Sequence, residues 1–131
     1  MIDPPGGDAV LQAVARWLRE TALPRLPADL VFQARVAANA IDLVAREMQL
    51  GPPSAEQSRA RIAALLGHDG GLATLEAELA EQIRSGALAI DAPGLFEHLL
   101  ADAMARMAID QPAYASHQAE LTHAGTRAPA P

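Results

Sequence analysis

Residues 29–50 carry the sequence DLVFQARVAANAIDLVAREMQL, and this stretch decides the fold. Other apolar residues flank its main apolar stripe on both sides, so most of the circumference of a helix formed here is apolar. A helix of this kind contacts neighbours on several sides, which predicts a long central helix. The main stripe recurs at alternating spacings of four and three residues and consists of Leu30, Ala34, Ala37, Ile41, Val44 and Met48.

The remaining surface of this helix is a narrow polar stripe opposite the apolar one. It consists of Arg35, Asn39, Asp42 and Arg46. Asp42 precedes Arg46 by four residues, the favourable order for an ion pair, and Arg35 can reach Asn39. Two interpretations stay open: a solvated stripe, which is the more ordinary one, or the lining of a cleft or partner surface with two guanidinium groups for an anion. Asn39 favours the second, because asparagine is a poor residue for a helix interior.

Proline and glycine divide the rest of the chain into helical segments. Gly51-Pro52-Pro53 is expected to end the central helix, and no stretch alternates with the period of a strand. We therefore predict an all-α fold, a compact bundle of about five helices around the long central helix. The predicted segments are residues 8–23, 29–50, 54–66, 72–85 and a last helix that begins near residue 91.

Local signals set the ends of these segments. Ser54 and Gln57 match a capping box at the start of the third segment. Gly67 and Gly86 are natural stops for the third and fourth segments. Asp91 is expected to cap the last helix, with a proline in its first turn.

The length of 131 residues fits one domain with a core of its own. We predict a single helical domain over residues 1–114. The helical periodicity dissolves from Gln111 onward, and residues 115–131 are predicted to form a disordered tail.

The composition excludes several classes of function. The chain contains no cysteine, which excludes disulfides and thiol chemistry, and its ten basic residues are all arginine, which excludes a catalytic lysine. A net charge of −6 without a basic run argues against nucleic-acid binding. The start of the chain lacks the features of a signal peptide, and no apolar run is long enough to cross a membrane. We therefore expect a cytoplasmic protein that binds neither nucleic acid nor membrane.

No catalytic constellation emerges from the sequence. His98 and Asp102 lie four residues apart on the last predicted helix, a spacing that could orient an imidazole or share a metal. No third ligand lies near them, so a surface hydrogen bond is the ordinary explanation. His68 and Asp69 precede two glycines in a loop that lacks the strand of a phosphate-binding turn. We expect no catalytic residue, no metal and no cofactor.

Three stretches, taken together, resemble a known family. They are residues 9–19 followed by Leu23-Pro24, residues 32–40 continuing through 44–47, and residues 106–114. In this order they resemble an uncharacterised family of small bacterial helical proteins, a domain of unknown function. The resemblance covers about residues 3–114, and residues 32–39 are its most specific part. The last stretch departs from the family pattern at Gln111, where asparagine is common, and at Ala113, where arginine is common.

The resemblance implies partners but no reaction. Members of the family tend to be encoded beside aminoglycoside-phosphotransferase-like kinases and acyl-CoA dehydrogenases. The resemblance therefore implies an accessory to a phosphotransferase-like enzyme in acyl-CoA-related catabolism. The sequence itself leaves two docking partners open, such an enzyme or a second copy of this chain.

Three functional hypotheses follow. The first is a non-catalytic accessory or interaction protein. The alternative is a binding module for an anionic ligand, an acyl-CoA or a phosphate, held by Arg35 and Arg46. The third and weakest is an enzyme that uses His98 and Asp102.

Overall fold

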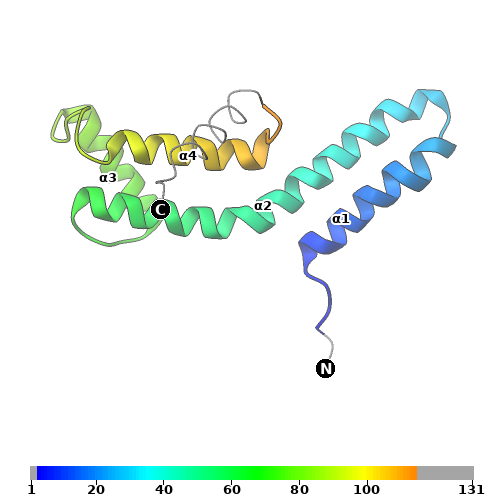
Figure 1. The fold of residues 1–131 in the computed structure, drawn as a ribbon, viewed down its shortest axis with the longest axis horizontal. Helices are drawn as coiled ribbons and strands as arrows, with labels where there is room; N and C mark the ends of the chain where they lie inside the picture. The colour runs from blue at the N-terminus through cyan, green and yellow to red at the C-terminus, as the bar shows by residue number, and fades with distance from the viewer. Residues whose placement is uncertain (1–2, 115–131) are drawn as a thin grey trace, which may run out of the picture. The chain divides into compact units, whose positions relative to one another are not determined.

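A computed structural model of the chain describes residues 3–114. Within this range the chain is helical and contains no strand, which confirms the predicted all-α class. Figure 1 shows its four α-helices, α1 (Gly7–Trp17), α2 (Ala28–Leu66), α3 (Leu72–Ser85) and α4 (Leu95–Asp110). A π-helical turn, η1 (Leu18–Ala22), and a 3-10 turn, η2 (Leu23–Arg25), connect α1 to α2.

The prediction of about five helices is wrong by one, because α2 does not end at Gly51. It continues through Pro52 and Pro53 to Leu66, so the second and third predicted segments are one helix. Proline removes a backbone donor and restricts the residue before it, which is why a break was expected. Gly51 relieves part of that restriction, since it has no Cβ to collide with the Pro52 ring. Ser54 lies inside the helix and caps nothing.

The start of the last helix also differs from the prediction. Gly94, rather than Asp91, occupies the N-cap of α4, with φ of 86°. A left-handed residue can precede a helix here because glycine has no side chain to clash. The predicted ends at Gly67 and Gly86 are confirmed, and both glycines have positive φ, at 80° and 81°.

The chain divides between Gly51 and Pro52 into two units. The predicted extent of a single domain over residues 1–114 stays a prediction, and the predicted tail, residues 115–131, lies outside the described residues.

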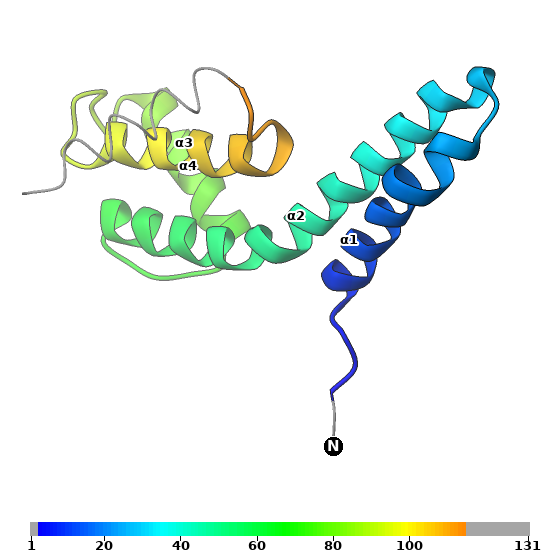
Figure 2. The ribbon, with the colours of Figure 1, turned by 45° about the vertical axis from the view of Figure 1, so that its right-hand side comes forward.

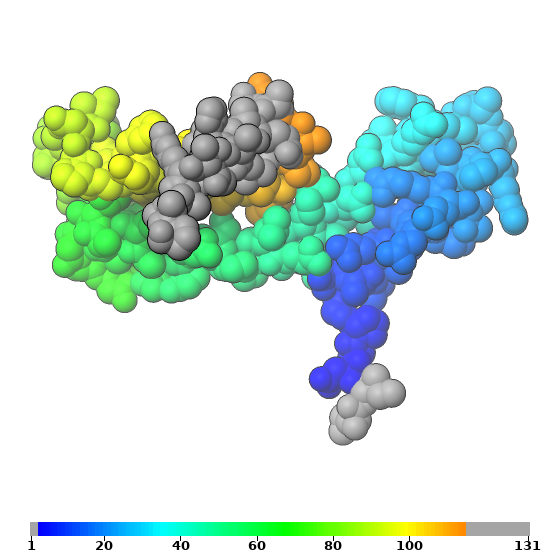
Figure 3. Space-filling model, in the orientation of Figure 1, coloured from blue at the N-terminus to red at the C-terminus, as the bar shows by residue number. Residues whose placement is uncertain are grey.

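The N-terminal unit is an antiparallel helical hairpin of α1 and the first part of α2 (Figure 2). At one end Gln49 Nε2 donates to Asp8 Oδ2 at 2.8 Å, and at the other Arg19 donates to Asn39 Oδ1 at 2.8 Å. In the space-filling view the atoms of α1 and of the first part of α2 are in contact (Figure 3). The buried side chains of the described part of this unit are small: Ala15, Ala38 and Ala45.

The hairpin's seam is rotated by part of a turn around α2 from the expected stripe, with which it shares Ala34 and Ile41. The seam follows Val31, Ala34, Ala38, Ile41 and Ala45, whereas Leu30, Val44 and Met48 of the predicted main stripe stay 40%, 46% and 47% exposed. Small side chains allow two helix backbones to approach closely, so alanines rather than the larger residues line the seam.

The C-terminal unit is built from the end of α2, α3 and α4. In both ribbon views α4 runs alongside the second half of α2 in the opposite direction (Figures 1 and 2). Its core is larger and fully aliphatic, and consists of Ile62, Leu75, Leu79 and Leu95, with partly buried residues around them.

Candidate functional site

The predicted polar stripe on α2 lies beside the hairpin seam and faces Arg19 of η1. Arg19 donates to Asn39 Oδ1 at 2.8 Å and forms an ion pair with Asp42 at 2.6 Å. The π-helical turn places this arginine over the stripe, and extra residues of this kind inside helices often mark functional positions. Arg19 was missed at the sequence level, because nothing in its neighbourhood signals a π-helical turn.

A hollow of about 320 Å³ lies at this point, lined by Arg19, Leu23, Arg35 and Asn39. The Arg35 guanidinium hydrogen-bonds no residue in the described part of the chain, so it adds an available positive charge to the hollow. Asp42 neutralises Arg19 from one side. The structure thus brings Arg35 and Asn39 together with Arg19, while Arg46 is not among the residues that line the hollow.

The opposite face of the hairpin is apolar. On α1, Val10, Val14 and Trp17 lie on the side of the buried Ala15 away from Arg19. On α2, the side of Ala38 away from Asp42 is apolar as well. Because the helices are antiparallel, the two sides form one face. We call it the apolar face; it comprises Val10, Val14, Trp17, Leu30, Val44 and Met48, each between 40% and 56% exposed.

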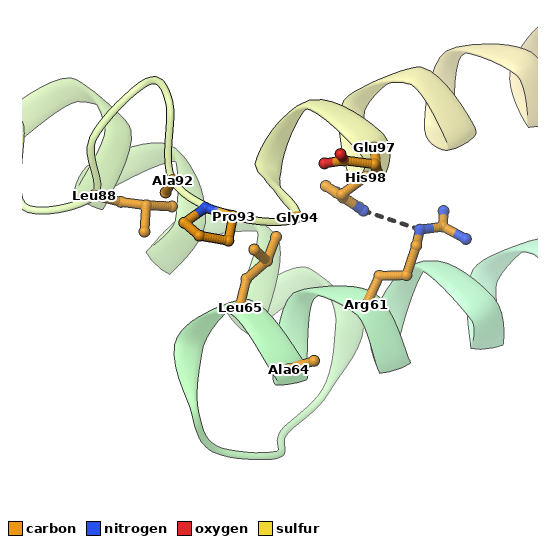
Figure 4. A pocket seen from close by; sticks show the side chains of 9 residues that line it. All are labelled: Arg61, Ala64, Leu65, Leu88, Ala92, Pro93, Gly94, Glu97 and His98. Carbon is orange, nitrogen blue, oxygen red and sulfur yellow. Dashed lines mark hydrogen bonds between the residues drawn. The ribbon is translucent and has the colours of Figure 1, made fainter.

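A second hollow lies in the C-terminal unit, with a volume of about 460 Å³. Gly94 borders it, and a Cβ added at Gly94 would lie 3.3 Å from Leu65 Cδ2, so the glycine lets this loop approach α2 closely. Figure 4 shows apolar side chains at one end of the hollow and a polar group at the other. Its lining is Arg61, Ala64, Leu65, Leu88, Ala92, Pro93, Gly94, Glu97 and His98.

The polar end depends on one hydrogen bond between α2 and α4. Arg61 Nε donates to His98 Nδ1 at 3.1 Å, and His98 is only 4% exposed (Figure 4). Burial lowers the pKa of His98, and the positive charge of Arg61 acts in the same direction. Since Nδ1 accepts this bond, the neutral ring carries its proton on Nε2.

The sequence expectation for His98 is therefore corrected. Asp102 does not pair with His98 but accepts a hydrogen bond from Arg106 Nε at 3.0 Å. His98 is a buried, arginine-bound residue rather than half of a surface pair, because α4 turns it towards α2. Among the described residues no cluster of three potential metal ligands occurs.

The loop between α2 and α3 is held by charged pairs. Asp69 Oδ1 accepts from the Gly70 backbone at 2.7 Å and pairs with Arg59. His68 Nε2 lies 2.8 Å from Glu78 Oε1, and this bond raises the pKa of His68. These contacts fix the turn and engage the His68 and Asp69 side chains within the chain.

Comparison with known proteins adds one finding. Residues 24–114 match the family described as "Domain of unknown function (DUF6285)". The matched segment includes α2, α3 and α4, and with them the whole hollow around Arg61 and His98. Neither the curated proteins nor the solved structures contain a match to this chain. No helix in the described residues has the length and apolar character of a membrane span.

Proposed function

The chain belongs to the DUF6285 family, and from this premise we propose that it is a non-catalytic helical interaction protein. Its docking surface is the apolar face of the N-terminal hairpin. The observation that carries the proposal is the exposure of Val14, Trp17 and Val44 beside a seam in which only alanines are buried.

The size of the apolar face supports docking. Its six side chains offer on the order of 500 Å² of apolar surface, the size of the largest patch on an ordinary monomer. A stable interface buries roughly 800 Å² on each partner, so the face supplies the larger part of what is needed. Covering the apolar face would also stabilise the hairpin, because its three buried alanines exclude little apolar surface from water.

The occupant that fits best is a second copy of this chain. The apolar face contains no charged residue, so two copies can meet without repulsion between like charges. Two hairpins packed through such faces form a four-helix bundle, a common arrangement of antiparallel helices. The phosphotransferase-like kinases and acyl-CoA dehydrogenases implied by the family resemblance are the other occupants that the test must separate.

Sedimentation velocity over a range of protein concentrations tests this proposal. We expect self-association in the wild type and at least about tenfold weaker association in Val14→Glu, because the variant buries a charge in the interface. Gln12→Glu is the matched control, since it adds the same charge to the polar side of α1 and should associate like the wild type.

Two outcomes would overturn parts of the proposal. The wild type could instead stay monomeric and bind the kinase-like enzyme, with loss of this binding in Val14→Glu. That outcome would support the apolar face as the docking surface but would show that its partner is the enzyme and not a second copy. A monomer that binds neither itself nor the kinase-like enzyme would overturn the interaction function.

A second candidate function is the binding of a small anion in the hollow around Arg35. It is favoured by the two guanidinium groups of Arg19 and Arg35 at one hollow, with a single carboxylate, Asp42, opposing them. Thermal unfolding with inorganic phosphate and with acetyl-CoA tests it. Stabilisation should disappear in Arg19→Ala with Arg35→Ala and persist in the control pair Arg16→Ala with Arg25→Ala; equal stabilisation in both pairs would contradict the candidate.

A further inference from the structure

The hollow of the C-terminal unit has a sharp division between apolar and polar walls. Leu65, Leu88, Ala92 and Pro93 form one end, and Arg61, Glu97 and His98 form the other. Figure 4 shows the guanidinium of Arg61 on the side away from Leu88 and Pro93. A volume of about 460 Å³ lies within the range of small-molecule sites.

The polar end holds hydrogen-bond donors that have no acceptor among the described residues. Arg61 uses Nε for His98, and its terminal nitrogens bond to no other described residue. The proton on His98 Nε2 likewise has no described acceptor, although the side chain is 4% exposed. These donors are available to a ligand in the hollow, and the charge of Arg61 favours an anionic one.

The first turn of α4 also favours an anionic ligand in the hollow. Gly94 provides no side-chain cap, and in the described residues the backbone N–H groups of Phe96 and Glu97 have no partner. Uncapped donors at the start of a helix favour a nearby negative charge. They add to the attraction that Arg61 creates.

Glu97 limits how much negative charge the hollow accepts. Its carboxylate belongs to the same polar end as Arg61 and His98, so this end has the charge to hold at most one carboxylate of a ligand. A second carboxylate would have to lie against the apolar end, where Leu65, Leu88 and Pro93 offer it no side-chain donor. We propose that the hollow binds a small monocarboxylic acid with a short aliphatic chain. The carboxylate lies at Arg61 and His98, and the chain lies along Leu65, Leu88 and Pro93.

Titration calorimetry with hexanoate tests this site directly. The wild type should bind hexanoate and should bind adipate, the dicarboxylate of equal chain length, at least about tenfold more weakly, since the second carboxylate of adipate would lie against the apolar end. Hexan-1-ol and hexylammonium should also bind more weakly. Preference for hexylammonium would overturn the proposal, because Glu97 would then be the group that recognises the ligand.

Variants assign the binding to the hollow. Arg61→Gln should weaken hexanoate binding by about tenfold or more, and Arg61→Lys should retain part of it. Glu97→Gln should bind hexanoate more tightly than the wild type, because it removes the negative charge from the polar end. Arg106→Gln is the matched control on α4, because Arg106 pairs with Asp102 and is not part of this lining. Circular dichroism establishes that each variant is folded. Hexanoate affinity that is unchanged in folded Arg61→Gln, or absent in the wild type, would contradict the site.

Discussion

At the scale of single residues, the hydrogen bond from Arg61 to His98 links helices that are distant in the sequence. Arginine can only donate, so the bond exists only while His98 is neutral at Nδ1. Burial of His98 favours the same neutral form. One buried imidazole thus ties the packing of α4 against α2 to its protonation state.

This bond predicts a loss of stability in acid. The pKa of His98 is lowered in the folded state from its ordinary value of 6.5. The unfolded chain therefore takes up a proton first, and the free energy of unfolding falls as the pH drops from 6.5 towards the folded-state pKa. Chemical denaturation at several pH values should show this fall.

A non-titrating variant isolates the contribution of His98. Asparagine keeps an acceptor close to the position of Nδ1. The free energy of unfolding of His98→Asn should therefore change less with pH in this range than that of the wild type, even if the variant is less stable at every pH. His68 affects stability at higher pH. Because its pKa is raised in the folded state, it adds to the free energy of unfolding below pH 6.5, and this contribution is lost as the pH rises above 6.5. A slope below pH 6.5 that is the same in His98→Asn and the wild type would refute the assignment to His98.

Arg19 supports a second prediction at this scale. Its bonds to Asn39 and Asp42 join η1 to α2, with side-chain exposures of 39% and 29% for the ion pair. Because the pair is partly exposed, Arg19→Ala should cost only about 1 kcal/mol. A double-mutant cycle with Asp42→Ala should give a coupling energy of a few tenths of a kcal/mol or more. Arg16→Ala, one turn earlier, should be close to neutral, and a zero coupling energy would show that the ion pair contributes nothing.

At the scale of elements, sequence patterns located helices better than their junctions. The ends at Gly67 and Gly86 could be predicted, since a left-handed glycine stops a helix by local chemistry. The passage of α2 through Pro52 and Pro53 could not, because local rules predict a break at that point. The candidate sites divide in the same way. The periodicity of one helix predicts that Arg35 and Asn39 lie together. Arg19 joins them, and Arg61 contacts His98, only through tertiary packing.

The junction before α4 yields a prediction for this scale. Gly94 has φ of 86° and little space for a Cβ, with Leu65 Cδ2 at 3.3 Å. Gly94→Ala should therefore lower the free energy of unfolding by about 1–2 kcal/mol. Gly71, the N-cap of α3, has φ of −68° and no atom within 4 Å of an added Cβ. Gly71→Ala should be nearly neutral, and equal effects of the two substitutions in denaturant unfolding would contradict this account of the junction.

At the scale of the whole molecule, the two units differ in how they are stabilised. The C-terminal unit has a core of large aliphatic side chains, whereas the described hairpin buries only alanines and exposes much larger residues on its apolar face. A helical hairpin with so small a core gains stability from association. The central claim is therefore that the apolar face is covered by a second copy of the chain in solution.

Trp17 makes that claim directly measurable. It is the only tryptophan of the chain and lies on the apolar face, 56% exposed. Its fluorescence emission should shift to shorter wavelength as the protein concentration rises, because association removes the indole from water, and Val14→Glu should remain at the long-wavelength position. An emission maximum that stays the same in the wild type at every concentration at which the protein remains in solution would contradict the claim.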